Sequence, residues 1–159
     1  WKGALNIARD FFISGVGTGN QAFVTVYPKY SLAGIEGAPH SHNLYLQLLV
    51  ELGIFGLLLF IGAMVSFSRA NFSFYRSDVS AKTGHRYISI GGFSGVLAVL
   101  AQGMTDYVWY NYRIFLLFWL LVGLTIASRR AGIFENPIRA VKRIEDCSAD
   151  RAVIDIITI

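Results

Sequence analysis

The sequence predicts an all-α membrane protein: a bundle of transmembrane helices with an external loop that contains a short amphipathic helix. Two observations lead to this prediction. Hydrophobic residues make up 54% of the 159 residues, more than an ordinary soluble domain contains. Three apolar segments also approach the length of about 20 helical residues that crosses a bilayer. Buried helices of a soluble protein are the alternative, and such long uninterrupted apolar runs argue against them.

Charge placement orients these segments. Bases gather after the first apolar run, at Arg69, Arg76, Lys82 and Arg86, and again in the last 31 residues, 129–159. Because Lys and Arg accumulate in cytoplasmic loops near helix ends, both regions are expected inside the cell. The predicted order is an external loop 1–43, a transmembrane helix 44–68, a cytoplasmic loop 69–86, a transmembrane helix 87–108, a short external turn 109–110, a transmembrane helix 111–128 and a cytoplasmic tail 129–159.

The first residues, the single cysteine and the charges of the tail further limit the class of protein. The opening residues WKGALN include no initiator methionine and no signal-peptide pattern, so we expect the C-terminal portion of a longer polytopic protein. The single cysteine, Cys147, excludes an intrachain disulfide and a CxxC metal site. Acids in the basic tail nearly balance its bases, and aromatic residues are few there. Nucleic acid is therefore not an expected partner, whereas the lipid bilayer is.

Small residues mark the expected contacts between helices. Gly91 and Gly95 form a GxxxG pair in the second membrane segment, and Gly53 and Gly56 form a smooth patch in the first. Small side chains let membrane helices approach closely. These pairs predict the faces on which the helices pack.

The external loop begins with an amphipathic pattern and a glycine-rich turn. Apolar residues at helical spacing, Trp1, Ala4, Leu5, Ala8, Phe11 and Phe12, predict a short helix on the membrane surface. The turn GVGTGN follows at 15–20. Its glycines Gly15, Gly17 and Gly19 allow positive φ and expose N–H groups that suit phosphate. The spacing lacks the dinucleotide-binding pattern, so a plain turn is favoured and a phosphate contact remains open.

Polar residues stand where the first membrane helix begins. Asn43, Gln47 and Glu51 are four residues apart and share one helix face. Within a membrane such a stripe faces a bundle interior or a wet cavity. A hydrogen-bonded structural brace and a functional cavity are both open interpretations. Asn43 also suits a helix cap.

Two histidines, His40 and His42, lie just before this stripe. Histidine titrates near neutral pH and can act as a base. His42 stands directly above the stripe, so it is the candidate catalytic residue, and His40 is expected to be a bystander. No metal site is predicted, because two histidines without a neighbouring Cys or Asp form an incomplete ligand set. A triad of Ser41, His42 and Asp106 is arithmetically open, although no nucleophile elbow is present.

Several motifs occur in a characteristic order. After the tryptophan-led helix come GVGTGNQAF, VYPKY and HSHNLYLQLLVELGIFGLLLF, and later DYVWYNYRIFLLFWLLVGL. This order, over about residues 1–128, resembles the O-antigen ligase and polymerase family of bacterial polytopic membrane glycosyltransferases. The most specific part is the core HN-x-YLQ-x-x-x-E-x-G-x-x-G.

The resemblance implies a function in cell-envelope polysaccharide biosynthesis, such as that of lipopolysaccharide. Enzymes of this family transfer a glycan from a polyprenyl diphosphate carrier to a glycan, lipid or protein acceptor, at the outer face of the cytoplasmic membrane. They need no cofactor and no essential metal. The functional histidine of the family matches His42, while its diphosphate-binding arginines lie mainly upstream of this chain. The further candidates for substrate binding are Arg9, Gly15, Gly17, Gly19, Asn43, Gln47 and Glu51.

Two other functions remain open. A polymerase of polysaccharide repeat units would use the same donor and differ only in its acceptor. A non-catalytic component of polysaccharide export belongs to a different class, and it should carry pore-lining polar residues in several helices. Polarity here concentrates at one outer edge, which favours an enzyme. The fragment alone is expected to be inactive.

Overall fold

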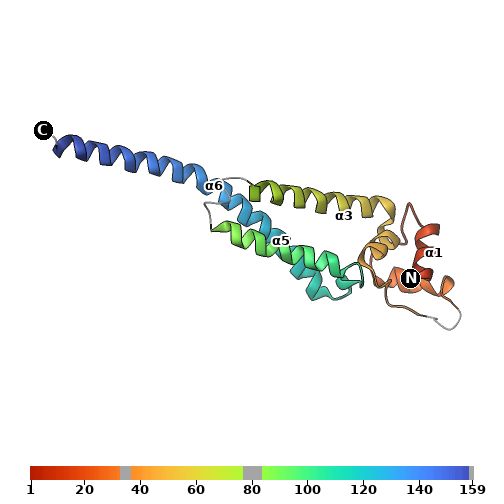
Figure 1. The fold of residues 1–159 in the computed structure, drawn as a ribbon. Coiled ribbons are helices and arrows are strands. Elements are labelled where there is room, and N and C mark those ends of the chain that lie inside the picture. Colours follow the sequence, from red (N-terminus) through yellow and green to blue (C-terminus); the bar gives the residue numbers. More distant parts are fainter. Residues whose placement is uncertain (33–36, 77–83, 158–159) are drawn as a thin grey trace.

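The structure, a computed structural model, describes residues 1–32, 37–76 and 84–157, with side chains for all of these except residues 20 and 135–157. The described residues form helices and no strand. In chain order the elements are α1 (Lys2–Asp10), α2 (Asn20–Val26), the 3-10 turn η1 (Tyr27–Lys29), α3 (Leu44–Arg76), α5 (His85–Gln102), the 3-10 turn η2 (Val108–Tyr110) and α6 (Tyr112–Ile157) (Figure 1).

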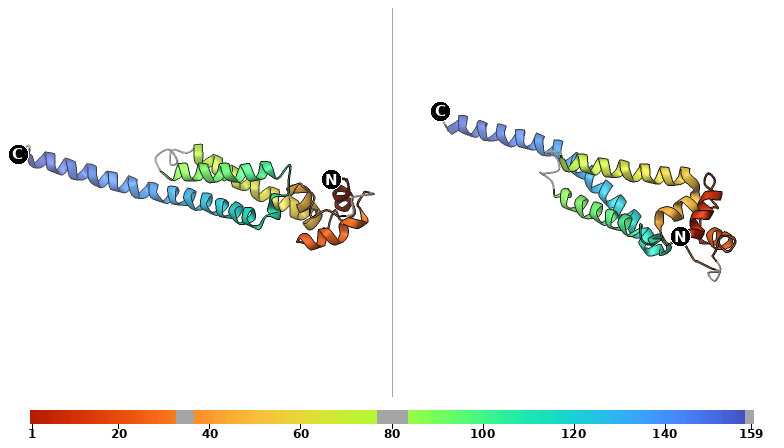
Figure 2. Two further views of the ribbon diagram at one scale, coloured as in Figure 1. Left: turned by 90° about the horizontal axis from the view of Figure 1, so that it is seen from below. Right: turned by 45° about the vertical axis from the view of Figure 1, so that its right-hand side comes forward.

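The molecule is elongated. The long part of α3 runs roughly along α5 and α6, and α6 continues past them to the C-terminus (Figures 1 and 2). The short elements α1, α2 and η1 gather at the opposite end, which also holds the connection 103–111 between α5 and α6. We call this the head end. Lys82 and Asp78 of the predicted loop 69–86 lie outside the described residues.

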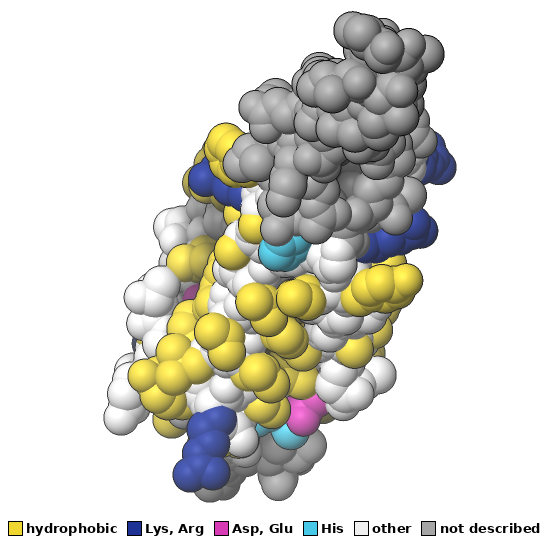
Figure 3. Space-filling model, turned by 90° about the vertical axis from the view of Figure 1, so that its left-hand side faces the viewer, with side chains coloured by type: hydrophobic (Ala, Val, Ile, Leu, Met, Phe, Trp, Pro, Cys, Tyr) yellow, Lys and Arg dark blue, Asp and Glu magenta, His cyan; other side chains and the backbone are white. Residues whose placement is uncertain are grey.

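Within the described residues, two helices are long and apolar enough to cross a membrane: α3, and α6 over Tyr112–Phe134. Their outward faces carry large apolar side chains, with Leu59 76% and Leu120 66% exposed. Hydrophobic side chains also cover much of the face seen in Figure 3. The predicted all-α membrane fold is therefore confirmed. The third predicted span, 87–108, corresponds to α5, and its membrane crossing remains a prediction.

The helix α5 ends at Gln102 rather than at 108. The N–H of Gly103 still bonds to the Val99 carbonyl at 2.9 Å, but the N–H groups of Thr105 and Asp106 both bond to the Gln102 carbonyl, at 3.0 and 3.1 Å. Such tightening is typical of a helix C-terminus. As a result Asp106 stands in a loop at the head end instead of on a membrane helix.

A break at Gly53, which the sequence analysis did not predict, divides α3. Gly53 has φ 68° and ψ −173°, outside the helical region. The part before the break turns towards α1 (Figure 1). Peptide groups released by the break find partners in the loop after α1: Val16 N–H to Val50 O at 2.8 Å, Gly17 N–H to Glu51 O at 3.1 Å, and Ile54 N–H to Phe12 O at 2.8 Å.

Two glycines permit this close contact between the break in α3 and the loop after α1. A Cβ on Gly53 would collide with the carbonyl of Ile13, and a Cβ on Gly15 would collide with the carbonyl of Glu51. Both glycines also have positive φ, which L-residues with side chains rarely adopt. Gly53 therefore serves a backbone crossing rather than the predicted smooth patch for helix packing.

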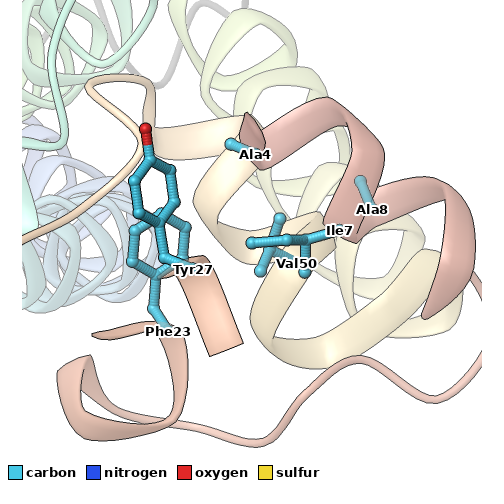
Figure 4. Packing of buried hydrophobic residues seen from close by; sticks show 6 residues of the cluster. All are labelled: Ala4, Ile7, Ala8, Phe23, Tyr27 and Val50. Atoms are coloured by element: carbon cyan, nitrogen blue, oxygen red, sulfur yellow. The ribbon is translucent and has the colours of Figure 1, made fainter. Parts of the chain in front are cut away.

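The first helix packs on the protein through one face. Ala4, Ile7 and Ala8 of α1 are buried against Val50 of α3 and the aromatic rings of α2 and η1 (Figure 4). The predicted helix is therefore present, and Ala4 and Ala8 of its predicted apolar face pack on the protein. Its position on the membrane surface remains a prediction. Leu5, by contrast, is 55% exposed.

A second cluster joins the three long helices. It comprises Met64 and Phe67 of α3, Phe93 and Val96 of α5, and Phe118 and Val122 of α6. Gly92 and Gly95 of α5 face Thr125 and Leu121 of α6, whereas a Cβ on Gly91 would meet nothing within 4 Å. The predicted Gly91–Gly95 pair is thus correct at Gly95 and wrong at Gly91.

Candidate functional site

A cluster of His40, His42 and Asp106 lies at the head end. The Nδ1 atom of His42 is 3.2 Å from Oδ1 of Asp106, across 64 residues of sequence. Both side chains are accessible, 60% exposed for His42 and 50% for Asp106. The pair thus combines a proton-accepting group with a carboxylate partner at a place that a substrate can reach.

Hydrogen bonds between the start of α3 and the end of α5 hold the pair together. Asn43 donates from Nδ2 to the Met104 carbonyl at 2.7 Å, and the Leu44 N–H donates to the Gly103 carbonyl at 2.7 Å. Asn43 also accepts the Leu46 N–H at 2.9 Å through Oδ1, which makes it the helix cap that the sequence suggested. The candidate Asn43 therefore acts by fixing the backbone beside His42.

The backbone of His42 is held in an unusual conformation. Its φ is 52°, the left-handed region that non-glycine residues seldom occupy. Its N–H donates to Nδ1 of His40 at 3.3 Å, and its carbonyl accepts Nε1–H of Trp1 at 3.3 Å. Strained residues of this kind concentrate at functional sites.

His40 is a partner of His42, a role that the sequence analysis missed. Its side chain is buried, and its ring lies 4.3 Å from that of His42 and 4.8 Å from that of Tyr110, between centroids. Burial, and then the nearby His42, lower the pKa of His40. Because its Nδ1 accepts the His42 N–H, its proton resides on Nε2.

The protonation states within the pair follow from their contacts. A bond of 2.8 Å from the Tyr107 N–H, and then the bond from His42, lower the pKa of Asp106, so its carboxylate is ionised. An ionised carboxylate can only accept, so Nδ1 of neutral His42 carries the proton and Nε2 keeps a free lone pair. Burial and then the charge of Glu51 raise the pKa of Tyr107 to about 12, so this phenol stays neutral.

The candidates Gln47 and Glu51 form a chain of internal hydrogen bonds. Gln47 accepts the Ser41 N–H at 2.8 Å and donates to Glu51 Oε1 at 2.8 Å. Glu51 accepts the Gly19 N–H at 3.1 Å through Oε2. Both side chains are buried. These bonds form the hydrogen-bonded structural brace. They link the segment that carries His40 and His42, which we call the histidine loop, to the glycine-rich turn.

The three glycines of the GVGTGN turn use their N–H groups within the protein. Gly15 donates to the Phe11 carbonyl at 2.8 Å, Gly17 to the Glu51 carbonyl at 3.1 Å and Gly19 to the Glu51 side chain at 3.1 Å. A phosphate would have to displace these bonds. The geometry therefore favours the plain turn over a phosphate contact.

Two further candidates are not joined to the cluster. Arg9 lies in the last turn of α1 with an exposed side chain, and within the described residues no ion pair links it to Asp106. Ser41 is buried, and its hydroxyl donates to the Asn43 carbonyl at 2.9 Å. The described contacts thus pair His42 with Asp106 and give Ser41 no place in a triad.

Fold and site together define the class: an all-α membrane protein that presents a His–Asp pair at one end of its helices. A family model described as O-antigen ligase matches residues 1–61, which include His40, His42 and α3 past its break. Neither the curated proteins nor the solved structures contain a match to this chain. The chain is therefore similar to the O-antigen ligases over its first part. The resemblance expected for residues 62–128, including Asp106, remains a prediction.

Proposed function

We propose that this chain is the C-terminal portion of a multi-pass glycosyltransferase of the cytoplasmic membrane, which moves a glycan from a polyprenyl diphosphate carrier to an acceptor hydroxyl or amide at the outer face. The observation that carries the proposal is the accessible His42–Asp106 pair, whose histidine lies in the segment that matches the O-antigen ligase family.

In this reaction the acceptor hydroxyl needs a base, because it is a poor nucleophile at neutral pH. Nε2 of His42 takes its proton as the oxygen attacks the anomeric carbon. The bond from that carbon to the diphosphate oxygen breaks, and the electron pair leaves with the diphosphate. Asp106 stabilises the imidazolium that forms. A direct displacement of this kind inverts the configuration of the sugar.

The place of the pair suits a lipid-linked donor. It lies where α3 begins, at the end of apolar helices that expose Leu59, Phe55 and Leu120. A polyprenyl chain in the bilayer would bring its diphosphate to this level, where polar groups meet water. The leaving diphosphate needs cations, for which guanidinium groups are suited. Arg9 is the arginine among the candidate residues, and its exposed side chain leaves it available.

The remaining candidates position the base in this proposal. Asn43 fixes the start of α3 beside the Asp106 loop, and Gln47 and Glu51 tie the histidine loop to the glycine-rich turn. Buried polar groups that satisfy one another rigidify their surroundings. These residues therefore act through the geometry of His42 rather than through contact with the glycan.

The experiment that tests this function supplies the full-length protein in liposomes with a glycan on polyprenyl diphosphate, with and without an acceptor. Glycan on the acceptor supports the ligase. Longer carrier-linked glycans in the absence of acceptor instead support the repeat-unit polymerase. An unconsumed donor would contradict both enzymes and favour the export component.

A further inference from the structure

We propose that His40, His42 and Asp106 bind one Zn²⁺ ion, and that this ion blocks the proton-accepting role of His42. Each residue offers one ligand atom, and the three atoms lie within 4.8 Å of one another. The sequence predicts no metal site, because no Cys or Asp lies near the two histidines along the chain. In the fold, however, the loop after α5 brings Asp106 to both of them.

The donor set and its spacing suit zinc. Imidazole nitrogen and carboxylate oxygen are ordinary zinc ligands, and three protein ligands with an open fourth position form an open zinc centre. Zinc–ligand bonds of about 2.0–2.1 Å place two ligands of a tetrahedron about 3.3 Å apart. His42 Nδ1 and Asp106 Oδ1 are already 3.2 Å apart. The exposed ring of His42 has freedom to close the longer distances. At His40 the ion would take the Nδ1 lone pair and displace the weak bond of 3.3 Å from the His42 N–H.

Packing around the cluster pre-organises it. His40 is buried, and its ring lies close to three others: 4.3 Å from that of His42, 4.8 Å from that of Tyr110 and 5.6 Å from that of Tyr107, between centroids. Outer groups that hold a histidine ring strengthen its metal affinity. Two neutral imidazoles and one carboxylate carry one negative charge, which attracts a divalent cation.

His42 could not bind zinc and accept a proton from the acceptor at the same time. Neutral His42 has one nitrogen lone pair. If the ion binds Nδ1, the ring proton moves to Nε2 and no lone pair faces the acceptor, and if it binds Nε2 the lone pair is used directly. The binding site stands on geometry alone, whereas its inhibitory effect rests on the proposed function.

The test begins with zinc bound by the purified full-length protein after equilibrium dialysis. We expect one ion per chain at this site, at least about tenfold weaker binding for His40→Phe and for Asp106→Asn, and unchanged binding for the control His85→Gln. Phe keeps a ring beside Tyr110 but removes the ligand. Equal binding by these variants and the wild type, or no binding by the wild type, would overturn the site.

A second readout needs no variant. Co²⁺ in the wild-type protein should give the intense visible absorption of a four-coordinate centre, and its absence would also count against the site. Glycan transfer is then measured with Zn²⁺ and after chelation. Reversible inhibition is expected. Binding without inhibition would leave the site standing and contradict the role of His42 as base, whereas a metal-free protein that transfers nothing would contradict the proposed function alone.

Discussion

Asp106 holds His42 through a contact of 3.2 Å between Oδ1 and Nδ1. His42 lies just before the start of α3, and Asp106 lies just after the end of α5. A backbone hydrogen bond of 2.7 Å, from the Leu44 N–H to the Gly103 carbonyl, holds the two segments together. The contact leaves Nε2 of His42 as the free acceptor. In the proposed reaction it therefore fixes both the tautomer and the direction of the base.

Asp106→Asn should lower glycan transfer by at least about tenfold, because an amide no longer stabilises the imidazolium and permits the wrong tautomer. The measurement is transfer per amount of protein in membranes. Asp10→Asn is a matched control, since Asp10 is an exposed carboxylate at the head end that bonds to Tyr30 at 2.8 Å. Equal losses in the two variants would contradict a specific role for Asp106.

Gly103→Ala should also lower transfer, by several-fold, without removing any reactive group. A Cβ on Gly103 would lie 2.9 Å from Cβ of Leu44, so the start of α3 and the Asp106 loop must separate. The control is Gly91→Ala in α5, the helix that ends just before Gly103, because an added Cβ on Gly91 meets nothing within 4 Å. Transfer at the wild-type rate in Gly103→Ala would show that this close approach is not needed.

Gly53→Ala should destabilise the fold. Ala must adopt φ 68° and its Cβ collides with the Ile13 carbonyl, which together cost about 1–3 kcal/mol. Thermal unfolding in detergent measures the change. Gly62→Ala, at an open position of the same helix, should be neutral or slightly stabilising. A Gly53 variant as stable as the Gly62 variant would argue against the docked break in α3.

The helices were predictable because their determinants are local. Apolar runs and helical spacing located α1, α3 and α6, and the polar side chain of Asn43 marked a helix cap that the structure confirms through its bond to the Leu46 N–H at 2.9 Å. The candidate site is predicted on equally local grounds, because His40 and His42 stand in a polar segment before an apolar run.

The break at Gly53 and the contacts of the site were not predictable, because they depend on tertiary packing. A glycine inside an apolar helix is an ordinary packing residue until a distant loop docks on it, as the loop at Gly15 does here. Likewise, the sequence predicts a membrane helix over 87–108 that includes Asp106, whereas the chain turns after Gln102 and brings Asp106 to His42. A proline after Gln102 would have indicated that the helix ends there. The sequence instead has GMTD at 103–106, which contains no proline.

The most direct test of the central claim compares glycan transfer by the full-length protein with His42→Ala, in membranes with matched expression. His85→Ala, a histidine at the other end of α5, is the control. We expect His42→Ala to lose about 10²- to 10⁴-fold in transfer and to accumulate the lipid-linked donor, while His85→Ala stays near the wild type. Transfer by His42→Ala at the wild-type rate would contradict the account.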